Sequence, residues 1–331
     1  GDYRRSEQSL VVDPAGNTYV ADAAHDGAAW NFLVAKYGPD GAVLWSVLID
    51  SPSAGTQHDW PTALALDPFG NVYVTGYSSG NPGGTDLLTV KLNSLGLQQW
   101  AVLHNGVGNP EELGRAIAVD AAGNVLVAGE RSGNSTDYLV VKYDPSGVQQ
   151  WSATLDGATH GEERLFGLAV DGSGSPYVTG WSRDAVSGAW DFMTVRWSTA
   201  GSLLWAVPFD NPAPGSQEDW AYGLAVDASG NAYVVGGSNS QFMVVKYDPA
   251  GAQQWATPYA GVSVGEAYAV AVNAGGDVVV TGAGTGGSSG WDLLTVKYDP
   301  AGLQQWAATS ENPEPGVQQD WAYAIAFDGL G

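Results

Sequence analysis

Cysteine is absent from this chain, and basic residues are scarce. Without cysteine there is no thiol nucleophile, no disulfide and no thiolate-bound metal, and the redox compartment is left open. Only 12 Lys and Arg residues stand against 35 Asp and Glu residues, which gives a net charge of −23. Phosphate contacts need clustered cations, so we expect no nucleic-acid partner and no binding to an anionic membrane surface. No apolar run is long enough to span a bilayer, so we expect no membrane insertion.

Two catalytic motifs are also missing. The sequence has no Gly-x-x-x-x-Gly-Lys phosphate loop and no His-Glu-x-x-His zinc motif. A Gly-x-Gly string such as Gly282-Ala283-Gly284 precedes no predicted helix, so it does not indicate a dinucleotide site. These absences favour a protein that is not an enzyme, while leaving that question open.

Glycine and aromatic residues are abundant, and a repeat organises them. A unit of about fifty residues recurs six times, the usual length of one propeller blade. Near the end of each unit stands a tryptophan: Trp45, Trp100, Trp151, Trp205, Trp255 and Trp306. Successive tryptophans are 50 to 55 residues apart. The 46 glycines suit many short strands joined by tight turns.

The second unit illustrates the pattern. Residues 62–66 are almost continuously apolar, as in a buried strand, and residues 67–71 form an Asp- and Gly-containing turn. Strands are predicted over 72–75 and 87–92, and a fourth over 97–103 contains Trp100. We therefore predict an all-β protein, a β-propeller of four-stranded antiparallel blades that forms a single domain over residues 1–331.

The two ends of the chain leave the number of blades open. The chain has six complete blades plus one surplus innermost strand at residues 321–328. Six blades could close a ring if the surplus strand displaces the N-terminal strand or adds elsewhere. Alternatively, the chain is a fragment of a longer array with a larger ring. We favour six blades.

Two phrases carry a resemblance to a known family. Residues 224–236 read Leu-Ala-Val-Asp-Ala-Ser-Gly-Asn-Ala-Tyr-Val-Val-Gly, and residues 296–306 read Val-Lys-Tyr-Asp-Pro-Ala-Gly-Leu-Gln-Gln-Trp. The first resembles the bacterial SBBP-type β-propeller repeat and is similar to the NHL-type repeat. The second resembles the outer half of the same repeat, and more faintly the tryptophan-docking segment of quinoprotein propellers. The resemblance covers nearly the whole chain, and it implies a secreted or surface propeller and little chemistry.

Residue types that recur in every blade are explained by what every blade needs. The turn acids are expected to shape turns, the third-strand cations to pair with acids of neighbouring turns, and the six spaced tryptophans to pack blades. The turn positions are Asp13, Asp67, Asp120, Asp171, Asp227 and Asn273; the cations are Lys36, Lys91, Lys142, Arg196, Lys246 and Lys297.

Variation is confined to two kinds of loop, those between the second and third strands and those between blades. In an up-and-down blade both emerge on the same side, here called the loop face, and variable loops held by rigid strands carry function. Three long inter-blade loops there end in closely related Asp-Trp pairs. These pairs are the candidate partner-binding residues: Asp59 and Trp60, Asp219 and Trp220, Asp320 and Trp321.

The other inter-blade loops carry acids near the same place, which predicts a ring of carboxylates around the mouth of a central channel. Three interpretations remain open: the acids shape the loops, they bind Ca²⁺, or they flank tryptophans that recognise a partner. No two histidines share a ligand-like spacing. The candidate metal ligands are Glu112, Glu163, Glu266, His58 and His160. No cofactor is firmly implied beyond candidate Ca²⁺, and the scarcity of basic residues argues against a quinone.

The leading hypothesis is a non-enzymatic propeller, secreted or at the cell surface, that binds a protein or polysaccharide through its loop face. One alternative is a propeller hydrolase or lyase with carboxylate-bound Ca²⁺ at the channel mouth. Another is a structural segment of a larger surface or adhesin protein. The low lysine content with plentiful Gly, Ser, Thr and Asn favours an exported bacterial protein and an extracellular location.

Overall fold

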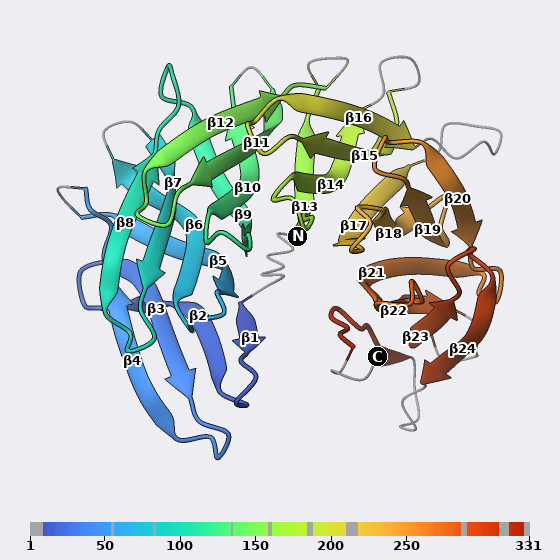
Figure 1. Cartoon of the computed structure of the whole chain (residues 1–331), viewed down its shortest axis with the longest axis horizontal. Coiled ribbons are helices and arrows are strands. Elements are labelled where there is room, and N and C mark those ends of the chain that lie inside the picture. Colours follow the sequence, from blue (N-terminus) through green and yellow to red (C-terminus); the bar gives the residue numbers. More distant parts are fainter. Residues whose placement is uncertain are drawn as a thin grey trace. The chain divides into compact units, whose positions relative to one another are not determined.

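The computed structural model describes residues 9–53, 56–81, 84–133, 135–157, 161–183, 188–209, 218–285, 290–310 and 318–327. Every element in these ranges is a β-strand (Figure 1). The chain divides into two compact units, residues 1–156 with 162–165 and residues 157–161 with 166–331. No described segment forms a helix long and apolar enough to cross a membrane.

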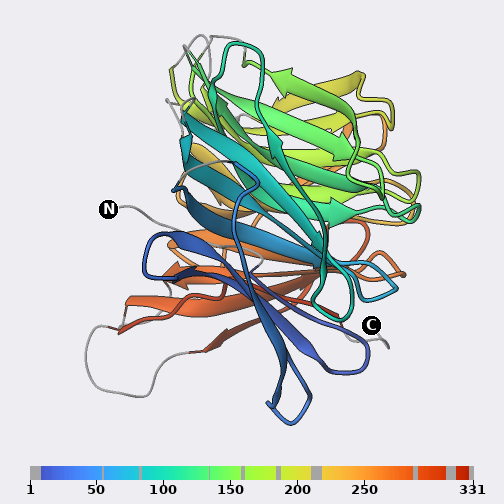
Figure 2. The ribbon, with the colours of Figure 1, turned by 90° about the vertical axis from the view of Figure 1, so that its left-hand side faces the viewer.

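The first three blades lie in unit 1 (Figure 2, blue to green strands). Blade 1 contains β1 (Leu10–Val12), β2 (Thr18–His25), β3 (Trp30–Tyr37) and β4 (Val43–Ile49). Blade 2 contains β5 (His58–Leu66), β6 (Val72–Asn81), β7 (Gly84–Leu92) and β8 (Gln98–His104). Blade 3 contains β9 (Glu111–Val119), β10 (Val125–Ser132), β11 (Thr136–Tyr143) and β12 (Gln149–Leu155).

Three further blades follow, of which the last two lie wholly in unit 2. Blade 4 contains β13 (Glu163–Val170), β14 (Pro176–Arg183), β15 (Trp190–Trp197) and β16 (Leu203–Phe209). Blade 5 contains β17 (Asp219–Val226), β18 (Ala232–Ser238), β19 (Gln241–Tyr247) and β20 (Gln253–Pro258). Blade 6 contains β21 (Val264–Val272), β22 (Val278–Thr285), β23 (Gly290–Tyr298) and β24 (Gln304–Ser310).

Each blade is a sheet whose four strands are hydrogen-bonded in sequence order, so the predicted all-β propeller of six four-stranded blades is confirmed. The surplus strand predicted at residues 321–328 is not formed over the described residues 321–327. The surplus segment instead contains the short strand β25 (Gln318–Gln319), which pairs in parallel with β23. Farther along, the amide of Asp320 donates to the carbonyl of Trp291 at 2.7 Å. The segment is thus attached to the loop-face end of blade 6.

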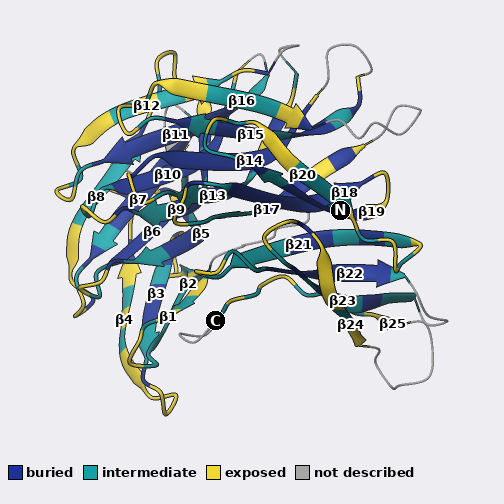
Figure 3. Ribbon diagram, turned by 45° about the vertical axis from the view of Figure 1, so that its right-hand side comes forward, coloured by how far each residue is buried: buried dark blue, intermediate teal, exposed yellow. Residues whose placement is uncertain are grey.

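The core lies between the flat faces of neighbouring blades. In unit 2, side chains of β14 and β15 pack with those of β18 and β19, and the second and third strands of a blade are its most buried elements (Figure 3). The fourth strands, such as β20 and β24, consist of half-buried and exposed residues. This burial pattern follows from the sequence, where second and third strands are rich in Val, Tyr and Phe.

The repeated turn acids shape the turn between first and second strands, as predicted. In blade 2, Asp67 Oδ1 accepts the amides of Phe69 and Asn71, both at 2.9 Å, and Gly70 supplies a φ of +77°. Third-strand cations also pair with acids at this end of the blade. Lys142 Nζ lies 3.3 Å from Asp120 Oδ2, and Arg196 Nη2 lies 2.8 Å from Asp171 Oδ2.

The spaced tryptophans connect one blade to the next, which confirms the prediction that they pack blades. In four of the six, the indole N–H donates to a backbone carbonyl in the following blade's turn between third and fourth strands. The pairs are Trp45 with Ser94, Trp100 with Pro145, Trp205 with Pro249 and Trp255 with Pro300, at 3.0 to 3.2 Å. Each ring also covers a glycine of that turn.

Candidate binding site

The candidate site lies where inter-blade loops enter the innermost strands. In the repeat, one acidic position comes eight residues before the turn residue; it is Asp219 before Asp227 and Asp59 before Asp67. Asp59, Glu112, Glu163 and Asp219 all occupy this position and have no exposed surface. Asp320 is half-buried. The acidic partners of the predicted Asp-Trp pairs therefore lie inside, except for the last.

These buried acids hold the loops that lead into the innermost strands. Asp59 Oδ2 accepts the amide of Ser51 at 2.8 Å. Glu112 Oε2 accepts the amide of Gly106 at 3.1 Å and lies 2.7 Å from Nδ1 of His104. Burial raises the pKa of Asp59, because it removes water from the carboxylate. The geometry in these two loops agrees with the loop-shaping interpretation of the acids.

The tryptophan that follows the acid is the more exposed member of each pair. Trp220 is 36% exposed and Trp321 is 42% exposed, both in unit 2. In unit 1, Trp60 is half-buried and stacks on Trp30, with ring centroids 5.2 Å apart and an interplanar angle of 26°. Gly236 permits the close approach of the Trp220 carbonyl, since a Cβ at that position would overlap the carbonyl oxygen. Next to it, a β-bulge between Ala221 and Gly223 interrupts the register of β17.

A series of aromatic rings runs along the innermost strands of unit 2 and onto the segment that follows β25. Phe166, Tyr222, Tyr268 and Tyr323 each come three residues after the position of the repeated acid. Neighbouring ring centroids in this series are 5.5, 5.3 and 5.2 Å apart. Trp220 and Trp321 each lie 6.5 Å from the tyrosine of their own segment, and Trp181 lies 6.1 Å from Trp220.

We did not predict this aromatic series from the sequence. The sequence does contain a pattern that predicts the series. An aromatic residue recurs three residues after the position of the repeated acid in four successive repeats. The same position holds Thr62 and Arg115 in unit 1. The series is therefore a property of unit 2 and not of the repeat as a whole.

A pocket of about 170 Å³ opens beside Trp220. It is lined by Glu218, Trp220, Tyr222, Gly237, Ser240 and Glu266. Glu218 is exposed, and Oε2 of Glu266 accepts the hydroxyl of Tyr268 at 2.6 Å. Gly265 lies eight residues before Asn273, so it occupies the position of the repeated acid. The next residue, Glu266, therefore corresponds to Trp220, which follows the acid Asp219. A carboxylate thus replaces an indole on one wall of this pocket.

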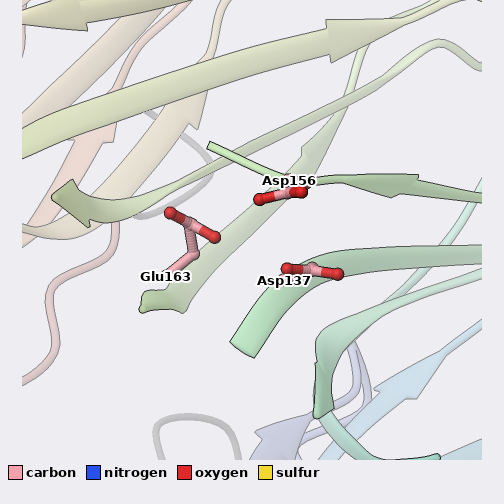
Figure 4. A group of neighbouring side chains, drawn as sticks. All are labelled: Asp137, Asp156 and Glu163. Atoms are coloured by element: carbon pink, nitrogen blue, oxygen red, sulfur yellow. The ribbon is translucent and has the colours of Figure 1, made fainter. Parts of the chain in front are cut away.

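The predicted metal candidates are placed apart. Carboxylate oxygens of Glu163, Asp137 and Asp156 all lie within 4.8 Å of one another in unit 1 (Figure 4). Ca²⁺ prefers such oxygen ligands, and these three residues could contribute to a cation site. Glu112 instead contacts His104, Glu266 lines the pocket in unit 2, and Nδ1 of His58 accepts the amide of Trp30 at 3.3 Å. His160 lies outside the described residues.

The fold and the repeated junctions define the class of this protein as a β-propeller. Residues 48–84 and 215–242 match the SBBP β-propeller repeat, so the chain carries the repeat that its sequence resembles. No curated protein sequence matches the chain at a significant level.

Solved structures similar to this chain are propellers of low sequence identity. A Lactobacillus plantarum protein has a TM-score of 0.60 at 16% identity, covering 93% of this chain and 85% of its own. The BP39L lectin of Burkholderia pseudomallei has a TM-score of 0.55 at 13% identity, covering 92% and 83%. The quinohemoprotein alcohol dehydrogenase ADHIIG of Pseudomonas putida HK5 has a TM-score of 0.54 at 12% identity, covering 92% of this chain and 60% of its own. At such identity these structures are informative about the fold alone.

Proposed function

We propose that the protein is a non-enzymatic β-propeller that binds a polysaccharide through aromatic side chains of unit 2. The observation that carries this proposal is the group of exposed rings of Trp220, Trp321 and Tyr323. They pack on a buried layer formed by Tyr222 and Tyr268, with the half-buried Phe166 at its end. Large aromatic side chains with exposed faces dominate the energetics of recognition surfaces.

The chemistry of this surface suits a sugar polymer better than a compact ligand. The C–H face of a sugar ring packs against an aromatic ring, whose π-face is electron-rich, while its hydroxyl groups need hydrogen-bond partners at the rim. The aromatic surface comes from the exposed rings of Trp220, Trp321 and Tyr323. The hydrogen-bond partners come from the side chains of Glu218, Glu266 and Ser240. One structural neighbour is described as a lectin, so sugar binding is compatible with this fold.

The composition supports an extracellular or cell-surface location for such a protein. With 12 basic residues and a net charge of −23, the chain repels other polyanions and stays soluble outside the cell. We propose this location on the composition alone.

The test is binding of the purified protein to a panel of polysaccharides, followed by calorimetry on those that bind. Replacing both Trp220 and Trp321 with Ala should weaken binding at least tenfold and leave the thermal unfolding transition within a few degrees of the parent protein. Phe69→Ala is the matched control, because this exposed aromatic residue lies on a turn of blade 2 outside the aromatic series. Global unfolding of the double variant would show that both tryptophans are core residues and would overturn their assigned role. Binding to none of the panel would overturn the proposal.

A Ca²⁺-dependent hydrolase or lyase is the second candidate, and the acid cluster of Asp137, Asp156 and Glu163 is the observation in its favour. Incubating a bound polysaccharide with the protein and Ca²⁺, with and without a chelator, separates the two functions. Binding without new chain ends in either sample supports the binding protein. Chelator-sensitive release of fragments, lost in Glu163→Gln, would replace it with the enzyme.

A further inference from the structure

The pocket beside Trp220 owes its shape to the backbone of blade 5. β18 and β19 are joined by a two-residue turn, Asn239–Ser240, whose φ angles are +49° and +62°. Such a turn normally calls for glycine at one or both places, so this conformation is held against a local cost. Blade 2 has more residues between the equivalent paired positions, Ser78 and Asp86, than blade 5 has between Ser238 and Gln241. The short turn of blade 5 leaves Ser240 and Gly237 on the pocket wall.

Gly237 keeps the floor of the pocket open. A Cβ at this position would lie 3.1 Å from Cγ of Glu266, closer than ordinary side-chain contacts. The carboxylate of Glu266 can therefore lie over the backbone of β18 while its oxygen accepts the Tyr268 hydroxyl. Two features of the backbone, the tight turn and the glycine, thus place one carboxylate on the pocket wall.

The lining of the pocket favours a cation. Glu218 and Glu266 face it, Trp220 and Tyr222 provide aromatic surface, and none of its described lining residues is basic. Aromatic rings and carboxylates together form the usual environment for an organic ammonium group. The net charge of −23 strengthens the attraction for a cation and opposes entry of an anion.

The volume of the pocket limits what enters it. At roughly 30 Å³ for each water of the liquid, about 170 Å³ corresponds to five or six waters. Pockets that enclose a whole drug-sized ligand measure about 300 to 1,000 Å³. This pocket therefore accommodates one substituent and part of one sugar ring, while the rest of a polymer lies along the exposed rings of Trp220, Trp321 and Tyr323.

We infer that this pocket binds the protonated amino group of an amino sugar, and that the polysaccharide partner carries free amino groups. This inference rests on the proposed polysaccharide binding and adds the class of sugar. An acetylated amino group is neutral and leaves both carboxylates without a cationic partner, and a hydroxyl group lacks the charge as well. Trp220 belongs both to the pocket and to the aromatic surface, so one sugar residue contacts both.

Three oligosaccharides that differ only at carbon 2 of each ring provide the test. They are the β-1,4-linked tetramers of glucosamine, of N-acetylglucosamine and of glucose, compared by calorimetry at mildly acidic pH, where the amine is protonated. We expect the glucosamine tetramer to bind at least tenfold more tightly than the other two, because hydrogen bonds to charged groups are the stronger ones.

The acidic residues of the pocket give the matching variants. Glu218→Gln and Glu266→Gln should each reduce the preference for glucosamine about tenfold. Glu111→Gln is the control, because Glu111 is an exposed acid at the same place in the repeat as Glu218 but lies in unit 1. The Glu111→Gln variant should prefer glucosamine to the same extent as the parent protein. An equal loss in Glu111→Gln would assign the preference to net charge and overturn the pocket.

The outcomes distinguish this inference from the proposed function. Equal binding of all three tetramers would overturn the amino-sugar inference and leave polysaccharide binding intact. No binding of any polysaccharide or tetramer would overturn both. Binding of a lysine-rich peptide with no binding of any polysaccharide would also overturn both, because the ammonium group would then come from a protein.

Discussion

Asp59 and Asp171 both lie near the innermost strand of a blade, but their surroundings differ. Burial raises the pKa of Asp59. Burial acts in the same direction on Asp171, but hydrogen bonds from Ser173, Ser175 and Arg196 outweigh it and lower the pKa of this carboxyl. The charged form of Asp59 therefore destabilises the folded state, whereas the charged form of Asp171 stabilises it.

Asp59→Asn should make the protein more stable at neutral pH. The folded state binds the proton of Asp59 more tightly than the unfolded chain does, because its pKa is raised by burial. The protonated carboxyl therefore contributes stability that is complete below about pH 3.8 and is lost as pH rises through the folded-state pKa. Asparagine removes the ionisation and still offers an oxygen to the Ser51 amide. The gain over the parent protein, measured as the free energy of unfolding in denaturant, should grow between about pH 4 and pH 7. A pH-independent difference, or a loss at neutral pH, would contradict the assignment.

Asp171→Asn should have the opposite effect. A lowered pKa stabilises the folded state above pH 3.8, and this stabilisation is lost as pH falls through the folded-state pKa. At neutral pH the variant should lose on the order of 1 to 3 kcal/mol, because Arg196 loses a charged partner. The two proteins should approach one another in strong acid. Asp40→Asn, at an exposed turn, serves as the control and should change stability by less than about 0.5 kcal/mol.

At the scale of the element, the contact between a tryptophan and the next blade's turn is the unit that repeats. In unit 2, Trp205 donates to Pro249 at 3.0 Å and its ring lies over Gly251. The φ of Gly251 is +84°, and a Cβ there would lie 2.9 Å from the indole ring. Both the backbone conformation and the ring contact therefore require glycine at this turn.

Gly251→Ala should destabilise the protein by on the order of 1 to 3 kcal/mol, from backbone strain together with displacement of the Trp205 ring. Gly172→Ala is the matched control, since a Cβ at Gly172 meets nothing within 4 Å. The free energies of unfolding of both variants, measured by denaturant titration, check this expectation. Equal stability of the two variants would show that the tryptophan contact contributes little to the association of blades 4 and 5.

The elements also show which parts of the site could be predicted from the sequence. The Asp-x-x-Gly turns, the four strands and the spaced tryptophans follow from local residue chemistry, and they recur where predicted. The sequence did not show which residue of an Asp-Trp pair is the more exposed. The burial of Asp219 and the exposure of Trp220 depend on the neighbouring strand and on the bulge in β17. Likewise, Glu266 looks equivalent to the other junction acids until a count from Asn273 shows that it lies at the position of Trp220.

At the scale of the molecule, the charge of −23 is the property that acts over distance. The Debye length is about 10 Å in 0.1 M salt and about 3 Å in 1 M salt. Binding of the glucosamine tetramer should therefore weaken as salt is raised between these concentrations, while binding of the glucose tetramer should change little. Calorimetry of both ligands across the salt series checks this. Parallel curves for the two ligands would show that charge does not contribute to recognition.

The central claim is that Trp220 and Trp321 contact a polysaccharide while the spaced tryptophans connect blades. The most direct measurement is the NMR spectrum of the 14 tryptophan indole N–H groups during titration with a bound oligosaccharide. Trp→Phe variants assign the signals. The account predicts that the signals of Trp220 and Trp321 shift while those of Trp45, Trp100, Trp205 and Trp255 stay in place. Unshifted signals for Trp220 and Trp321, with saturating ligand, would contradict it.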